Sequence, residues 1–504
     1  MPGGPNASGA GGAASMPTVP EPGVDGPPGS SAEGQGGAVS LDPGMLEPGA
    51  AGAGGGAVAM PAGDEFVSDV QVTVHPRVNT VLVVTWTQQL EADSAFLEFT
   101  FEDGVVLKSR AAAGALGAHR DVVLGVPGDT DVTLRIVSQK AGTDFASSDY
   151  QGRTEAVPSG TNGFPTPTVL AYDASIASPD RWLLGAVENS EGGCGPECYN
   201  RWTYWTYIMD RKGRIVWYYA DPASNATSSF QRRARDGEYL WIEKRPYGRP
   251  GPRAVLKTTL DFEYSEEVPV ANLADSIDVT EDGSLLYDAQ NALREMSRDG
   301  TVRDIWSCRA QFGQTFSCYT NTINYVQATN SVWMSYPEEN TVVEVSRASG
   351  QLVASYGEAP GSFGFSPNTW EFEFQHFPNV TPEGTLLVSS HMPGHDDTYT
   401  PTAGEHAFVE FTIDRQNRQL VEKWFYNDGP EWAMYKGMAI RVANGNTLAN
   451  YGSGGVIREI TPDKRTAFHV KFDAPNGDDF YNKMVGHNEL IDDLYALNGG
   501  GPTP

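Results

Sequence analysis

Asp210-Arg211-Lys212-Gly213-Arg214-Ile215-Val216-Trp217 is the stretch that decides the fold, because it joins a polar turn to an apolar run that ends in an aromatic residue. The same form returns five times toward the C-terminus. Its further copies begin at Leu260, Ser297, Ala348, Asp414 and Thr461. Helical periodicity is scarce between these copies, so the pattern predicts β-strands separated by tight turns.

A second turn form alternates with the first. It occurs at Asp282-Gly283, Glu383-Gly384 and Asn444-Gly445, with further copies at 236–237 and near 330–333. Two different hairpin turns that alternate about every 50 residues are typical of four-stranded propeller blades. Six copies of the first form predict a six-bladed β-propeller over residues 165–497. The alternative is a tandem of β-sandwiches, which would not repeat the same pair of turns so regularly.

Residues 64–158 predict a separate antiparallel β-sandwich, because apolar and polar residues alternate in short runs. These runs are 70–74, 81–86, 96–101 and 132–137. Trp86 is the candidate core aromatic. The segment resembles a fibronectin type III or immunoglobulin-like domain, without the cysteine pair of true immunoglobulin domains.

Residues 1–63 are set apart by composition. They hold 18 of the 56 glycines and 10 of the 34 prolines, and no aromatic residue, Lys or Arg. Such a segment buries too little apolar surface to fold, so we predict a disordered Gly/Pro/Ala-rich tether. Its composition resembles the tether behind the lipid-bearing Cys of bacterial surface lipoproteins, which would place a lipid anchor upstream. No signal peptide is evident in the sequence.

The formal net charge of −29 argues against nucleic acid and anionic membranes as partners. The sequence contains no apolar run of about 18–20 residues, so it predicts no membrane span. It also contains no phosphate-binding loop, no dinucleotide-binding glycine motif after a strand and no Gly-x-Ser-x-Gly elbow. We therefore expect no cofactor.

The four cysteines form two close pairs, Cys194 with Cys198 and Cys308 with Cys318. This spacing favours two local disulfides, although four free thiols and a zinc site are alternatives. The spacing suits zinc poorly. Two disulfides would indicate an extracytoplasmic protein at the bacterial cell surface, in the periplasm or secreted.

Between residues 319 and 452 several short segments follow one another in a characteristic order. It includes Asn321, the pair Gln375-His376 and the turn Gly445-Asn446-Thr447-Leu448. In order and spacing, residues 165–495 resemble the arylsulfotransferases that act without 3′-phosphoadenylyl sulfate. This resemblance implies a propeller in which a histidine attacks an aryl sulfate and passes the sulfuryl group to a phenol.

Carried over by residue, the resemblance makes His376 the candidate nucleophile, with Asn321 beside it in the site. The chain departs from the family at two supporting positions: Tyr319 stands where the family has His, and Tyr336 where it has Arg. Both tyrosines become candidates for binding a small aromatic or phenolic ligand. A covalent transfer also needs cationic support, for which Lys436 and Arg441 are the candidates.

The sequence therefore leaves two functions open, and with them the question whether the protein is an enzyme. One is sulfuryl transfer through a sulfohistidine at His376. The other is a non-catalytic propeller that binds an aromatic, glycan or protein ligand at the cell surface, with His376 as a structural histidine.

The other histidines give weaker signals. We expect His391, His395 and His406 to lie in an exposed polar loop rather than a metal site, so no metal is predicted. His469 is expected on a strand face, and His487 carries no assignment. The Trp and Tyr residues between 202 and 219 suit an aryl or sugar pocket, or packing between blades.

Overall fold

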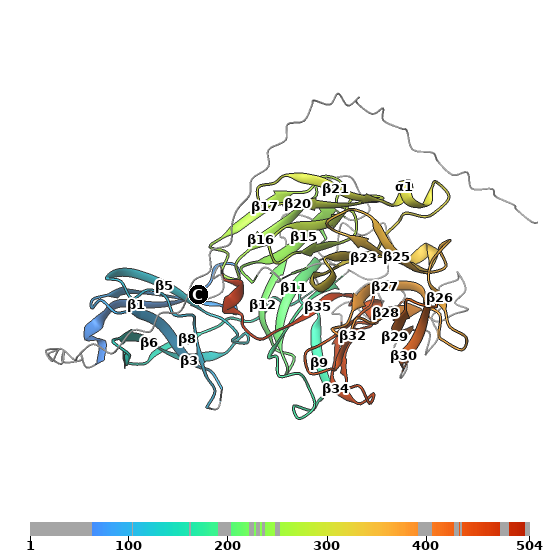
Figure 1. The fold of residues 1–504 in the computed structure, drawn as a ribbon. Coiled ribbons are helices and arrows are strands. Elements are labelled where there is room, and N and C mark those ends of the chain that lie inside the picture. Colours follow the sequence, from blue (N-terminus) through green and yellow to red (C-terminus); the bar gives the residue numbers. More distant parts are fainter. Residues whose placement is uncertain are drawn as a thin grey trace, which may run out of the picture. The chain divides into compact units, whose positions relative to one another are not determined.

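The computed structural model describes residues 63–102, 104–160, 163–189, 203–220, 226–227, 232–233, 237–246, 252–391, 406–427, 433, 436–473 and 483–498. The predicted tether at 1–63 lies outside this part of the chain, except for Gly63. The described residues are almost entirely β-structure (Figure 1), as the sequence predicts. Helical elements are short: η1 (Gly63–Phe66), α1 (Cys308–Phe312), η3 (Gln327–Thr329), η4 (Pro337–Glu339), η5 (Gly452–Gly454) and η7 (Tyr495–Leu497).

The N-terminal strands form two antiparallel sheets. One has the order β1-β2-β5 and the other β4-β3-β6-β7, with β8 also paired to β6. The strands are β1 (Val67–Val74), β2 (Leu82–Gln88), β3 (Ser94–Thr100), β4 (Val106–Lys108), β5 (Gly117–Val123), β6 (Asp131–Lys140), β7 (Thr143–Ala146) and β8 (Tyr150–Arg153). Alternate residues of β2 are buried, and Trp86 lies in the shared core as expected.

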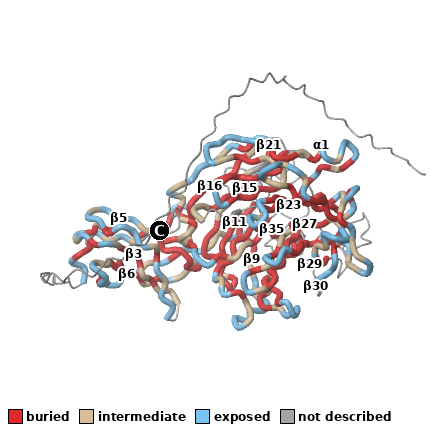
Figure 2. The backbone as a smooth tube through the Cα atoms, in the orientation of Figure 1, coloured by how far each residue is buried: buried red, intermediate tan, exposed pale blue. Residues whose placement is uncertain are grey.

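Residues 166–491 form six further sheets among the described residues, arranged as the blades of a β-propeller are. The first has the order β12-β11-β10-β35, and the third and fourth follow strictly as β18-β19-β20-β21 and β22-β23-β24-β25. First strands of neighbouring sheets contact one another, β18 with β22, β22 with β27, and β27 with β31. Strands of these sheets, such as β11, β15 and β23, are largely buried (Figure 2).

The strands of the first three sheets are β10 (Trp182–Asn189), β11 (Thr203–Asp210), β12 (Ile215–Ala220) and β35 (Val485–Ile491); β13 (Ala226–Thr227), β14 (Arg232–Arg233), β15 (Leu240–Pro246), β16 (Ala254–Thr258) and β17 (Ser265–Pro269); β18 (Ile277–Val279), β19 (Leu285–Asp288), β20 (Ala292–Met296) and β21 (Val302–Ser307). Those of the last three are β22 (Thr322–Val326), β23 (Ser331–Tyr336), β24 (Thr341–Ser346) and β25 (Leu352–Gly357); β26 (Gly364–Phe365), β27 (Glu373–Val380), β28 (Leu386–His391), β29 (His406–Asp414) and β30 (Gln419–Tyr426); β31 (Met438–Arg441), β32 (Thr447–Asn450), β33 (Val456–Ile460), β34 (Thr466–Asp473) and β9 (Thr166–Tyr172).

The two turn forms have separate places in this arrangement. The first form joins the third and fourth strands of a sheet, for example β11 to β12 through 211–214. The second form joins the first and second strands, for example β18 to β19 through Asp282-Gly283. Gly283 has a φ of +74° and its N–H donates to the Thr280 carbonyl oxygen at 2.8 Å, a conformation that glycine adopts without cost. The residues of each turn form therefore determine which two strands of a sheet the turn joins.

The array is closed by strands from its two ends. The early strand β9 pairs with β34 as the outer strand of the sixth sheet. The late strand β35 pairs with β10 as the first strand of the first sheet. The first and sixth sheets thus each contain a strand from the opposite end of the propeller sequence. Neither sheet is complete until the two ends of that sequence meet.

An ion pair repeats between neighbouring sheets. Glu295 of β20 binds Arg347 at 2.7 Å, and Arg347 belongs to the turn after β24. Glu459 of β33 lies 3.1 Å from Arg211, which belongs to the turn after β11. Burial alone would raise the pKa of Glu295, but hydrogen bonds from Arg347 and Arg303 lower it below its ordinary value. Each pair links a third strand to a turn of the next sheet.

The Arg211–Glu459 pair spans the closure between the sixth and first sheets. Both side chains are buried, at 6% and 0% exposure. A buried charge that loses its partner is strongly destabilising, by about 3–5 kcal/mol. Closure therefore rests on this ion pair as well as on strand pairing.

Cys308 and Cys318 form a disulfide between α1 and the segment before β22, as predicted. Cys194 and Cys198 lie outside the described residues, so their pairing stays a prediction. The N-terminal sheets also pack on the first propeller sheet. Thr80 Oγ1 donates to the Val216 carbonyl oxygen at 2.8 Å, inside a shared apolar cluster.

We predict that Arg211→Met lowers the free energy of unfolding by about 3–5 kcal/mol, because it leaves the Glu459 carboxylate buried without its ion pair. Arg465→Met is the matched control: Arg465 and Asp463 are both mostly exposed, so it should cost under about 1 kcal/mol. Urea denaturation measures both. Equal losses in the two variants would contradict this account of the closure.

Candidate functional site

The backbone of β27 is distorted on both sides of His376. Pairing with β28 shifts register before and after this residue. Phe374 and Phe377 have left-handed φ angles of +44° and +51°, which cost a bulky residue about 1–3 kcal/mol each. Two bonds hold the distortion: the Phe374 N–H donates to Asn340 Oδ1 at 3.1 Å, and the Phe377 N–H to Thr322 Oγ1 at 3.3 Å.

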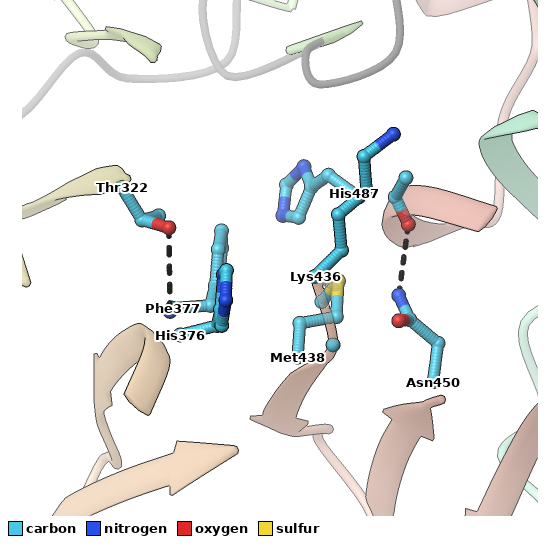
Figure 3. Close-up of a pocket in the computed structure, with 9 residues that line it drawn as sticks. Thr322, His376, Phe377, Lys436, Met438, Asn450 and His487 are labelled. Carbon is cyan, nitrogen blue, oxygen red and sulfur yellow. Dashed lines mark hydrogen bonds between the residues drawn. The ribbon is translucent and has the colours of Figure 1, made fainter. Parts of the chain in front are cut away.

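His376 lines a small cavity of about 20 Å³ among the first strands of the sheets. Figure 3 shows His376 and Phe377 facing His487, Lys436 and Met438 across this space. The full lining is Thr322, His376, Phe377, Lys436, Gly437, Met438, Asn450, Gly486 and His487. This volume is close to the 10–15 Å³ that one water needs. The cavity therefore admits a group of about one heavy atom.

Asn321 fixes the protonation of the His376 ring. Asn321 Nδ2 lies 3.1 Å from the Gln375 carbonyl oxygen and 3.0 Å from His376 Nδ1. A carbonyl oxygen can only accept a hydrogen bond, so the NH₂ group of Asn321 must face it. The second hydrogen of that NH₂ group then points to Nδ1, which accepts. In a neutral imidazole the proton is therefore on Nε2.

The Gln375 carbonyl that orients Asn321 is itself held in place. Ser335 Oγ donates to it at 2.7 Å. The Gln375 side chain is fully buried, and its Nε2 donates to the Thr341 carbonyl oxygen at 2.9 Å. The pair Gln375-His376 thus acts as one unit, in which the first residue anchors the orientation of the second.

The His376 ring is neutral over the physiological range. Burial, with smaller effects from the nearby His391 and Lys436, lowers its pKa to about 3. Among the described residues, Asn321 is the hydrogen-bond partner of the ring, and it takes Nδ1. The side chain remains partly exposed, and Nε2–H is left to donate to whatever enters the cavity.

Lys436 lines the same cavity as His376, which brings together two residues that the sequence had proposed. Its ammonium group forms a buried ion pair with Glu188 of β10. The next residue, Gly437, has a φ of +108°, and a Cβ there would lie 2.4 Å from Ser389 Oγ. Only glycine fits at that position, so the approach of Lys436 to the cavity is fixed by packing.

The expectation that His391 and His406 lie in an exposed loop is wrong. They end β28 and begin β29, directly paired, and only 6% and 2% of their surfaces are exposed. Ser389 Oγ lies 2.9 Å from His406 Nε2, and burial lowers the pKa of His406 well below its ordinary value. In the described part of the chain, no group of three or more His, Cys, Asp or Glu side chains could hold a metal ion. His395 lies outside that part.

The tyrosines proposed to bind a ligand do not line the His376 cavity, so their role stays a prediction. Tyr319 is 49% exposed in the segment before β22. Tyr336 is 1% exposed and packs with Trp306 and Phe316 in the core between the third and fourth sheets. It ends the second strand of its sheet, whereas the cavity is lined mainly by first strands.

The aromatic residues between 203 and 219 contribute to an apolar core. Trp205, Tyr207 and Trp217 belong to the largest apolar cluster. Trp202 lies outside the described residues. Arg441 does not line the His376 cavity. Its guanidinium group binds Glu410.

Sequence reasoning missed the far wall of the cavity. His487 is 4% exposed, and its ring lies 4.5 Å from the Phe377 ring. It belongs to β35, whose pairing with β10 at the other end of the chain brings it to the site. The polar run Gly486-His487-Asn488 inside a strand was the available signal.

Comparisons with known proteins find distant structural similarity. No protein family matches the chain, and no curated protein does either. One similar solved structure is an inactive virginiamycin B lyase from Staphylococcus aureus, solved with quinupristin. Its sequence is 10% identical, the match covers 64% of this chain and 99% of that chain, and the TM-score is 0.33. Hydrazine synthase from Kuenenia stuttgartiensis is 11% identical, with coverages of 53% and 75% and a TM-score of 0.36. With TM-scores below 0.5, these similarities carry no argument about this chain.

No helix among the described residues has the length and apolar character to cross a membrane.

We predict that His376→Gln makes stability less sensitive to acid. The unfolded chain binds a proton at His376 near pH 6.5, whereas the folded protein does so only near about 3. Folding stability therefore falls as the pH drops from 6.5 toward 3, by up to about 1.4 kcal/mol per pH unit for this group. The substituted glutamine would keep an acceptor for Asn321 but bind no proton.

Urea denaturation between pH 4 and pH 8 tests this. We expect the difference between their free energies of unfolding to be constant above pH 7 and to shift in favour of His376→Gln as the pH falls below it. Parallel curves over the whole range would show that His376 is not buried as a neutral ring.

Proposed function

We propose that this chain is an arylsulfotransferase-like propeller that binds an oxygen-bearing ligand at His376 without transferring a sulfuryl group. The observation that carries the proposal is the orientation of Asn321. Its NH₂ group is held by the Gln375 carbonyl and donates to Nδ1, so Nε2 of His376 presents a hydrogen rather than a lone pair.

A nucleophilic histidine requires the opposite tautomer. Attack on sulfur uses the lone pair of a neutral imidazole nitrogen, and a good nucleophile has a base or acceptor that holds the proton on the other nitrogen. Here Nδ1 faces a donor. With Nε2–H toward the cavity, His376 is suited to donate to a carbonyl, carboxylate or sulfate-ester oxygen of a ligand.

The size of the cavity supports binding over transfer. About 20 Å³ accepts one oxygen atom of a ligand, whereas a transferring sulfuryl group has three equatorial oxygens to surround. The cationic support is also reduced, because the Lys436 ammonium is already paired with Glu188. The remainder of the ligand, an aromatic, glycan or protein group, would lie outside the cavity.

Sulfuryl transfer is the second candidate, and one observation favours it. Lys436 and the neutral His376 line the same cavity, as a nucleophile and its electrostatic support would. Transfer would require Asn321 to release Nδ1 and the cavity to widen.

We infer that the six sheets of residues 166–491 are six blades and that residues 67–153 form a fibronectin type III-like domain. The Cys308–Cys318 disulfide supports an extracytoplasmic location.

The test uses p-nitrophenyl sulfate with phenol as acceptor. We expect calorimetric binding of p-nitrophenyl sulfate but no acceptor-dependent release of nitrophenolate. His376→Phe, which removes the donor, should weaken binding about tenfold or more, as expected for one hydrogen bond to a charged group. Tyr319→Phe is the control and should bind like the wild type.

Acceptor-dependent nitrophenolate release that disappears in His376→Ala would establish transfer and reject the binding proposal. Absence of binding, or binding that His376→Phe leaves unchanged, would reject His376 as the donor. Circular dichroism of each variant shows whether it is folded.

A further inference from the structure

Phe377 has the bulkiest side chain on the wall of the His376 cavity. Its ring is 4% exposed and packs against the His487 ring, with the two ring centres 4.5 Å apart. Figure 3 shows Phe377 beside His376, on the same side of the space. Two other positions on the wall are glycines, Gly437 and Gly486. The free volume next to His376 therefore depends on the Phe377 ring.

The backbone at Phe377 does not require this ring. Its φ of +51° lies in the left-handed region, which glycine adopts without cost and a bulky residue only under strain. The bond that holds this conformation runs from the backbone N–H to Thr322 Oγ1, so glycine would keep it. A strained residue of this kind is a reason to look for a function of its side chain.

The apolar core also gives no account of the ring. Among the described residues, Phe377 belongs to none of the apolar core clusters, whereas Phe372 of the same segment does. Its neighbours on the cavity wall include the polar residues Thr322, His376 and His487. Phe377 is thus a buried aromatic residue whose ring faces the candidate site.

The ring leaves space for one kind of head group. About 20 Å³ holds approximately one heavy atom. A carbonyl group is planar and presents a single oxygen, to which His376 Nε2–H can donate. A sulfuryl group is tetrahedral, so the atoms around its sulfur would meet the Phe377 ring when one of its oxygens reaches the same donor.

We propose that Phe377 is the specificity-determining residue of the His376 site, and that its ring selects ligands with a planar carbonyl head over ligands with a tetrahedral sulfuryl head. The proposal rests on the proposed function, in which His376 donates to a ligand oxygen. A sulfate ester would then bind through one oxygen and more weakly than a carbonyl compound.

Acetophenone and methyl phenyl sulfone test this selection. Both are neutral and share a phenyl and a methyl group, but the first has a planar head with one oxygen and the second a tetrahedral head with two. Nuclear magnetic resonance titration of the ¹⁵N-labelled His376 ring measures both affinities. We expect the wild type to prefer acetophenone about tenfold, and Phe377→Gly to bind both within about twofold, because small differences in fit change affinity by such factors.

Phe374→Gly is the matched control. Phe374 lies on the same strand and has a left-handed φ of +44°, but its ring does not line the cavity. This variant should keep the preference of the wild type. Phe377→Leu removes only part of the ring and keeps apolar packing, so it should fold and show an intermediate preference. An unchanged preference in both Phe377 variants, or an equal loss in Phe374→Gly, would overturn the proposal.

Xenon measures the space at position 377 without a hydrogen bond, since it binds apolar cavities of sufficient size. We expect xenon to shift the His376 resonance in Phe377→Gly, but not in the wild type or in Phe374→Gly. Folded Phe377→Gly that gives no xenon response would overturn the proposal. A xenon response without binding of acetophenone or the sulfone to any variant would instead reject the proposed function of His376, while Phe377 would remain the residue that sets the size of the cavity.

Discussion

The closure of the sheet array by β9 and β35 is the constraint on which the rest of the structure depends. β9 completes the sixth sheet from one end of the chain, and β35 completes the first sheet from the other. The buried Arg211–Glu459 pair crosses the same junction. Long-range pairing of this kind costs loop-closure entropy, so strand hydrogen bonds and a desolvated ion pair have to offset it together.

Closure also makes the site. His376 comes from the fifth sheet, Thr322 from the fourth and Met438 from the sixth, whereas His487 reaches the cavity only because β35 joins the first sheet. The left-handed backbone at Phe374 and Phe377 then sets His376 at the cavity. Local strain is thus stored at one strand and held by hydrogen bonds from its neighbours, which is common where a side chain has a function.

The sequence was informative where local chemistry determines structure. Turn residues such as Gly283 and Gly213 require particular backbone angles, so their spacing predicted which strands are joined. The local Cys308–Cys318 disulfide followed from spacing for the same reason. Trp86 followed from the alternation of its strand.

Sequence patterns were misleading where contacts between strands or sheets determine the surroundings of a side chain. Polar neighbours made His391 and His406 look like loop residues, although β28 and β29 bury both. Tyr336 stands where the family has Arg, and the burial of its ring in a core depends on contacts that the order of the sequence does not report. The tautomer of His376 depends on the Gln375 carbonyl, a backbone group that no side-chain motif reports.

The central claim is that His376 is a neutral hydrogen-bond donor whose proton is on Nε2. A long-range ¹H–¹⁵N spectrum of protein labelled with ¹⁵N-histidine at about pH 7 tests it most directly, with His376→Gln to assign the resonance. We predict an unprotonated Nδ1 and a protonated Nε2 for His376. A protonated Nδ1 with a free Nε2 would contradict the claim and restore His376 as a nucleophile.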